Sequence, residues 1–159
     1  MDEALSGHQA ELGAGSTKRG IAPVYADKMY RHGIRIIDLL DKNIFKEKLQ
    51  KAYSFNADIL EHVFKHPMKE NVEQIYEDYL KIADFIRPYV IDTEVLLHKA
   101  YKQGKQILFE GAQGMSLDPD HGMYPHTTSS NNVALYASVG SGLGFNSEAK
   151  IIGVVKAYV

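Results

Sequence analysis

Hydrophobic residues recur at helical spacing through the middle of the chain. Between residues 72 and 86 the apolar positions lie three or four apart, so they share one face of a predicted helix that buries this stripe. The stripe consists of Val72, Ile75, Tyr79, Ile82, Ala83 and Ile86. Shorter apolar groups predict helices over 44–52 and 59–64, and Pro67 and Pro88 are predicted to stop the helices before them.

The pattern changes towards the carboxyl end. Asp92 can cap one more helix, which Gly104 would end. The stretch "QILFEGA" (106–112) then predicts a short strand, and "KIIGVVKAYV" (150–159), rich in branched residues, predicts a second. Two strands are too few for a stable sheet, because each strand needs partners. The sheet is therefore expected to be incomplete.

Composition narrows the class of protein. The chain has 159 residues, 45% of them hydrophobic, which is enough for one domain with a core. Its 18 basic and 20 acidic residues give a net charge of −2, which favours neither a nucleic acid nor an anionic membrane as partner. The absence of cysteine agrees with a reducing compartment, and no apolar stretch is long enough to cross a bilayer. A soluble, cytoplasmic protein is expected.

The first candidate site lies in the polar loop "ILFEGAQGMSLDPDHGMYPHTTSSNN" (107–132), directly after the first predicted strand. Open α/β sheets tend to bind ligands at the carboxyl edge of their strands, and Gly111 and Gly114 leave room beside Gln113. The amide of Gln113 offers donors and an acceptor, which suits the edge of a nucleobase. Alternatively, Gln113 satisfies backbone groups of its own loop.

Four hydroxyl residues, 127–130, precede a predicted helix over 131–139. The amino terminus of a helix leaves N–H groups unpaired, so this segment could bind a phosphate. Simple helix capping is the alternative, for which one serine is sufficient.

A second possible anion site is a group of basic residues in an otherwise nearly neutral chain. Its members are Lys18, Arg19, Lys28, Arg31, His32 and Arg35. If 24–32 is helical, Lys28 and Arg31 share a face and could bind phosphate together. A solvated basic helix face is the commoner outcome of such a cluster.

Metal and nucleophile sites have less support. Asp118, Asp120 and His121 could bind a divalent cation, although Asp-Pro-Asp is more often a turn. No pair among the seven histidines has the spacing of a helical zinc site backed by a glutamate, and no Gly-x-Ser-x-Gly elbow is present. We therefore predict no metal site.

Two long motifs, "STKRGIAPVYADKMYRHGIRIIDLL" and "FEGAQGMSLDPDHGMYPHTTSSN", followed by "GSGLG" and "GVVKAY", closely resemble the adenylosuccinate synthetases. The resemblance implies an α/β fold of the type found in phosphate-loop NTPases, here an incomplete sheet with a mainly helical middle. It also implies a homodimeric ligase of AMP biosynthesis that uses GTP and magnesium to join aspartate to inosine monophosphate (IMP).

The resemblance assigns roles to four residues. Gln113 matches the glutamine that contacts the base near its 6-oxygen, and is the one catalytic group expected in this chain. Thr17 and Thr128 match threonines that hold the 5′-phosphate of IMP. Arg31 matches an arginine that reaches across the dimer interface to the phosphate of the neighbouring subunit.

The resemblance also predicts how the chain is organised into regions. We expect one segment of a synthetase domain, with a phosphate-loop and interface region (1–35), a helical region (36–104), and a strand, IMP-binding loop and strand (105–159). Lys18 stands where the family usually has glycine. The Gly-Asp-Glu-Gly-Lys-Gly-Lys loop that binds GTP and magnesium is absent from this sequence. The chain is therefore expected to carry the IMP-binding part and to be inactive alone; the alternative is a non-catalytic purine-nucleotide-binding or dimerisation module.

Overall fold

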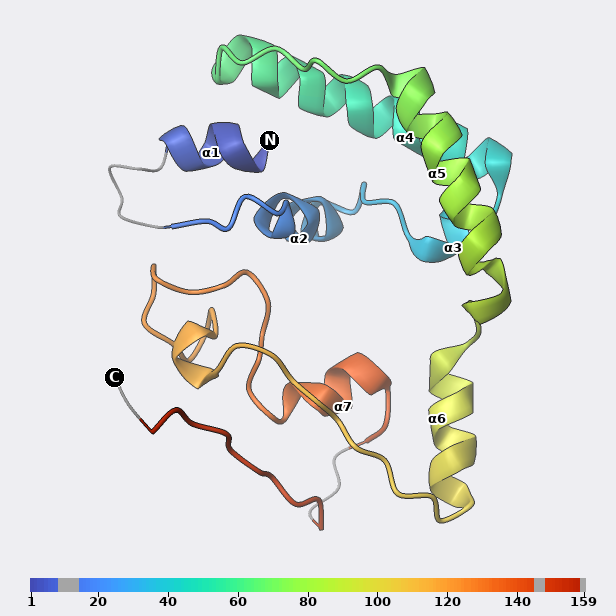
Figure 1. The fold of residues 1–159 in the computed structure, drawn as a ribbon, viewed down its shortest axis with the longest axis vertical. Coiled ribbons are helices and arrows are strands. Elements are labelled where there is room, and N and C mark those ends of the chain that lie inside the picture. The colour runs from blue at the N-terminus through green and yellow to red at the C-terminus, as the bar shows by residue number, and fades with distance from the viewer. Residues whose placement is uncertain (9–14, 145–147, 158–159) are drawn as a thin grey trace.

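A computed structural model describes residues 1–8, 15–144 and 148–157. The helical elements, in chain order, are α1 (Asp2–His8), α2 (Ile21–Tyr30), α3 (Ile36–Leu39), α4 (Lys42–Asp58), the π-helix η2 (Ile59–Val63), α5 (Val72–Ile86), the 3-10 helix η3 (Arg87–Tyr89), α6 (Thr93–Lys102), the 3-10 helix η4 (Met115–Leu117) and α7 (Tyr136–Ser141). Figure 1 shows α4 and α5 at one end, with α6 leading down to residues 105–157 at the other.

The core lies where α3, α4 and α5 meet (Figure 1). Leu39, Phe45 and Ala83 are buried there, and the Phe45 ring stacks on Tyr76 with ring centroids 5.5 Å apart. Tyr76 also ties α5 to the start of α4, since its hydroxyl donates a hydrogen bond of 3.3 Å to the carbonyl oxygen of Lys42. The predicted helical middle is therefore confirmed.

The buried face of α5 agrees with the predicted stripe only in part, since Ala83 and Ile86 of the stripe contribute to the core. Tyr79 and Ile82 are exposed, with 48% and 44% of their surface accessible, whereas Ala83 is buried and Leu80 packs against the core. The spacing of three and four correctly predicts a helix. It selects the buried face only approximately, because the contacts with α3 and α4 decide which members of the stripe are covered.

Side-chain caps define where the main helices begin. Asp41 accepts hydrogen bonds from the N–H groups of Asn43 and Ile44, at 2.9 and 3.1 Å, and so caps α4. Asp92 accepts from the N–H of Val95 at 3.1 Å, which confirms the predicted cap of α6.

Two predicted helices have different bounds in the structure. The helix predicted over 24–32 runs from Ile21 to Tyr30, and the one predicted over 131–139 is the short α7, from Tyr136 to Ser141. The glycines of "GSGLG" contribute to the end of α7: Gly142, with φ 70°, is its C-cap and lies against the side chain of Glu94 on α6.

The prediction of two strands is wrong for the part of the chain that the structure describes. Residues 106–112 and 150–157 form no strand, and residues 158–159 lie outside the described ranges. Leu108 and Val154 keep 87% and 94% of their surface exposed. The physical reason is the one noted from the sequence: a strand is stable only when neighbouring strands satisfy its backbone.

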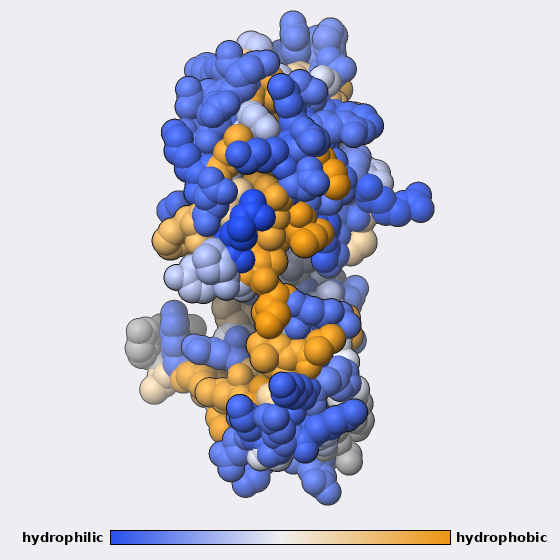
Figure 2. Space-filling model, turned by 90° about the vertical axis from the view of Figure 1, so that its right-hand side faces the viewer, coloured by the Kyte–Doolittle hydropathy of each residue, from blue (hydrophilic) through white to orange (hydrophobic). Residues whose placement is uncertain are grey.

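Apolar side chains also lie on the surface of the helical part. Figure 2 faces the side of the molecule formed by α5 and α6, and shows hydrophobic residues gathered in a band down its middle. Exposed apolar residues on these elements and their connection include Phe85, Tyr89, Ile91 and Val95. Among the described residues, no helix is both long and apolar enough to cross a membrane.

Candidate functional site: two loops anchored by buried aspartates

The loop that carries Thr17 is fixed to α1 by one carboxylate. Asp2, only 8% exposed, accepts a hydrogen bond from Ser16 Oγ at 2.8 Å through one oxygen and from the N–H of Gly20 at 2.7 Å through the other. Thr17 between them is exposed, and its hydroxyl makes no hydrogen bond within the described residues. The loop backbone is therefore held while the threonine hydroxyl stays available to a ligand.

Arg31 lies at the end of α2 in a left-handed conformation. Its φ is 69°, and its N–H donates to the carbonyl oxygen of Lys28 at 3.1 Å. The guanidinium is exposed and forms no ion pair with any described residue. The prediction that Lys28 and Arg31 share a helix face is wrong, because the helix ends at Tyr30 and the chain turns at Arg31.

The turn after α2 is stabilised by its neighbours. The His32 ring lies 3.0 Å from Asp27 Oδ1, and its ring centroid is 4.9 Å from that of Phe55 on α4. The N–H groups of His32 and Gly33 both donate to the carbonyl oxygen of Asp27, each at 3.2 Å. These contacts fix the backbone beside Arg31 and leave its side chain projecting from the surface.

Gln113 occupies a bend just before η4. Its φ of 64° is in the left-handed region that side chains other than glycine rarely adopt. The side chain is exposed and makes no hydrogen bond among the described residues. The alternative, that this amide satisfies the backbone of its own loop, therefore has no support from the structure.

Thr128 is brought back to the same loop by main-chain hydrogen bonds. Its N–H donates to the carbonyl oxygen of Leu117 at 2.8 Å, and the N–H of Met123 donates to that of Ser116 at 2.9 Å. Because Leu117 lies only four positions after Gln113, the predicted base-reading and phosphate-binding residues belong to one folded loop. Within the described ranges, no hydrogen bond joins this loop to Thr17 or Arg31.

Asp118 organises this loop from the inside. Its side chain is fully buried, and both carboxylate oxygens accept hydrogen bonds from backbone N–H groups. The donors are Asp120 at 2.9 Å, His121 at 3.1 Å, Asn132 at 2.7 Å and Val133 at 3.3 Å. Burial raises the pKa of Asp118, but these four donors outweigh it and bring the pKa down to about 2. The carboxylate is ionised at neutral pH and joins the turn at 118–121 to residues 132–133.

This geometry decides between the alternatives for "DPDHG". The oxygens of Asp118 are occupied by backbone donors, and Asp120 accepts from Asn131 Nδ2 at 2.6 Å. Among the described residues, no three histidine or acidic side chains are grouped to hold a metal ion. The sequence motif forms a turn. The Asp-Pro-Asp pattern indicates this turn, but it does not reveal that Asp118 is buried.

The same network explains why the hydroxyl run does not cap a helix. The N–H groups of Asn132 and Val133 are bonded to Asp118, and α7 begins only at Tyr136, six positions after Ser130. The predicted phosphate site at a helix amino terminus is therefore wrong.

Gly122 is required by the close packing of the loop. A Cβ at this position would lie 2.4 Å from the carbonyl oxygen of Ser116 and 2.5 Å from that of Asp118. Both contacts involve backbone atoms, so they cannot be relieved by rotating a side chain. Gly122 thus allows the loop to close on itself.

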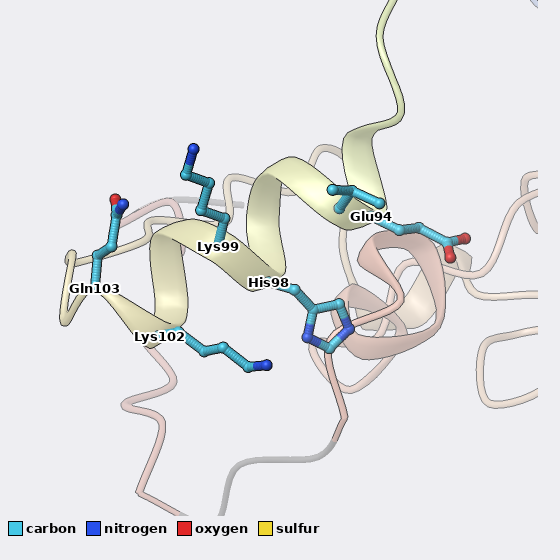
Figure 3. A pocket seen from close by; sticks show the side chains of 6 residues that line it. Glu94, His98, Lys99, Lys102 and Gln103 are labelled. Atoms are coloured by element: carbon cyan, nitrogen blue, oxygen red, sulfur yellow. The ribbon is translucent and has the colours of Figure 1, made fainter.

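A shallow depression of about 460 Å³ lies beside α6 and contains none of the predicted site residues. Figure 3 shows His98 directed towards α7, where its Nε2 lies 3.2 Å from the carbonyl oxygen of Gly142, while Lys99 and Gln103 project from the other side of α6. Glu94 and His98 thus serve the packing of α6 on α7.

Comparison with known proteins gives a consistent result. The family model described as adenylosuccinate synthetase matches residues 1–159. The adenylosuccinate synthetase of Carboxydothermus hydrogenoformans is 45% identical over 158 residues, which are 99% of this chain and 37% of that protein. The one of Caldanaerobacter subterraneus subsp. tengcongensis is 48% identical over 147 residues, which are 91% of this chain and 33% of that protein.

A solved structure shares the fold. The fully ligated adenylosuccinate synthetase from Plasmodium falciparum matches with a TM-score of 0.81 and 27% identity, over 90% of this chain and 33% of that chain. The chain therefore spans about a third of the length of the relatives it matches.

Proposed function

Because the chain belongs to the adenylosuccinate synthetase family, we propose that it forms the IMP-binding part of an enzyme that ligates aspartate to IMP at the expense of GTP. The structural match also confirms the expected fold class, a partial α/β fold of this family whose helical part the described residues form. The proposed enzyme acts in AMP biosynthesis in the cytoplasm.

In this proposal, Gln113 contacts the base near its 6-oxygen, and Thr17 and Thr128 hold the 5′-phosphate. The assignment rests on a property that these three side chains share. All three side chains lie in loops fixed by other residues, and none uses its own polar atoms within the described chain. A group held in place but left unpaired has little reorganisation to undergo when a ligand binds.

Arg31 is proposed to bind the IMP phosphate of a second subunit in a homodimer. Its exposed guanidinium has no acidic partner among the described residues, while the turn beneath it is fixed by the Asp27–His32 contact. A guanidinium offers a planar fork of donors that matches a phosphate.

GTP and magnesium have no counterpart in the residues that the structure describes. The carboxylates there are dispersed or already bonded, so the donor set does not fit a magnesium site. We therefore derive no phosphoryl-transfer step from this chain, and propose that GTP, magnesium and aspartate are bound by other parts of the enzyme.

Calorimetric titration of the purified chain with IMP, and in parallel with GTP, tests the proposal. We expect saturable binding of IMP, no binding of GTP, and weaker binding of IMP by Gln113→Ala and Thr128→Ala. Gln103→Ala and Thr93→Ala, at the two ends of α6, are the matched controls and should bind IMP normally. If all four variants bind IMP like the unaltered chain, the site assignment is wrong.

A further inference from the structure

The two loops of the proposed IMP site share a structural device that the sequence motifs do not reveal. Among the described residues, the buried acidic side chains are Asp2 and Asp118. Asp2 holds the loop of Thr17, and Asp118 holds the loop of Thr128. Every buried carboxylate described thus lies beneath a loop with a predicted phosphate-binding threonine.

Both aspartates bridge chain segments that lie apart in the sequence. Asp2, at the start of α1, reaches residues 16 and 20 on either side of Thr17. Asp118 joins its own turn to residues 132 and 133, and Thr128 lies in the intervening segment. Charge-assisted hydrogen bonds of this kind are stronger than those between neutral groups, which suits them to fix a loop.

The bonds to the carboxylates also decide which donors remain for a ligand. The N–H groups of Gly20, Asn132 and Val133 donate to the aspartates. In contrast, the hydroxyls of Thr17 and Thr128 make no hydrogen bond among the described residues. Each carboxylate thus withdraws backbone donors from its loop and leaves the threonine hydroxyl as a donor for an incoming anion.

We infer that Asp2 and Asp118 are positioning residues that hold Thr17 and Thr128 ready for the 5′-phosphate of the nucleotide. This inference deepens the proposed function and rests on it. Neither aspartate touches the ligand in this scheme, since both carboxylates are buried and bonded to their own loops.

The test compares the affinities for IMP and for inosine, which lacks the phosphate, in Asp2→Asn and Asp118→Asn. We expect each substitution to weaken IMP binding by roughly tenfold, the scale of one charge-assisted hydrogen bond, and to leave inosine binding unchanged. Asp41→Asn is the matched control, because Asp41 also accepts two backbone N–H bonds but caps α4, remote from both loops in sequence. It should change neither affinity.

A purely structural role gives a different result. If the substitutions only unfold part of the population, the affinities for IMP and inosine fall together, and the inference is overturned. It is equally overturned if neither affinity changes.

Hydrogen–deuterium exchange separates this inference from the proposed function. If the unaltered chain fails to bind IMP, the proposed function fails, and exchange decides the positioning role alone. Asp2→Asn should then speed exchange in 15–20 and not in 113–133, and Asp118→Asn the reverse. A uniform change along the chain, or none, contradicts the inference.

Discussion

At the scale of single residues, unusual backbone angles coincide with the proposed site. Among the described residues, the non-glycine positions with positive φ are Lys18, Arg31, Lys65 and Gln113. Arg31 and Gln113 are proposed ligand contacts, and Lys18 adjoins Thr17. Such angles are costly for side chains with a Cβ and tend to persist where a loop must present a group to a ligand. Only Lys65 has no such connection.

Lys18 offers a direct test of this strain. Its φ is 56°, in the left-handed region that glycine adopts most readily. Lys18→Gly and Lys18→Ala both remove the charge and differ only in the Cβ, so the glycine variant should be the more stable by up to about 1 kcal/mol. Urea unfolding of the two variants measures this difference. Equal stability would show that the left-handed angle carries no strain here.

The ionisation of Asp118 predicts how stability depends on pH. The pKa of Asp118 lies at about 2 in the folded chain, below the ordinary value of 3.8. At pH values between these two pKa values, the unfolded chain binds more protons than the folded chain. The contribution of Asp118 to folding stability is therefore complete above the ordinary pKa, and it is lost as the pH falls through the pKa of the folded chain. Thermal unfolding across this range should show Tm falling more steeply for the unaltered chain than for Asp118→Asn. Parallel curves would contradict this assignment.

At the scale of elements, the helical core depends on a few buried contacts. Asp38 reinforces the meeting of α3 and α4: Lys48 Nζ lies 2.6 Å from its carboxylate, and this hydrogen bond lowers the pKa of Asp38. Arg87 Nη2 donates to the carbonyl oxygen of Leu40 at 3.0 Å and so joins the end of α5 to α3. Phe45, which is 2% exposed, lies in the core formed by these helices.

Phe45→Ala should therefore destabilise the chain by about 3–5 kcal/mol, because it removes a large buried side chain and leaves a cavity. Phe55→Ala on the same helix is the control, since Phe55 is 47% exposed and should cost much less. Denaturant unfolding followed by far-ultraviolet circular dichroism measures both. A similar loss for the two variants would mean that this core is not the main source of stability.

At the scale of the whole molecule, much apolar surface remains uncovered. Residues 106–112 and 150–157 are rich in branched side chains and have no strand partners in the described chain. Ile152, Val154 and Val155 are at least 80% exposed. Exposed segments of this type pair readily with other chains.

We therefore expect the chain to self-associate as its concentration rises. Val154→Lys should reduce the association, because a charge opposes edge-to-edge pairing. Val95→Lys introduces the same charge at a position on α6 that is 63% exposed, and should have a smaller effect. Sedimentation velocity over a range of concentrations measures the outcome. A monomer at every concentration would show that these segments are protected in solution.

The sequence by itself determined the local structure. Apolar spacing predicts the helices of the middle region, Asp92 predicts a cap, and the motifs around Thr17 and Gln113 identify the family. These features depend on residues near one another in the chain, where side-chain chemistry and backbone preference act directly.

Tertiary structure alone decided which surfaces are covered and which polar groups are paired. It exposes Tyr79 and Ile82, leaves 106–112 unpaired, and turns Asp118 from a possible metal ligand into a buried anchor. Such outcomes depend on partners distant in the sequence. A strand needs neighbouring strands to satisfy its backbone, and a carboxylate is stable when buried only where folding brings enough N–H donors to it.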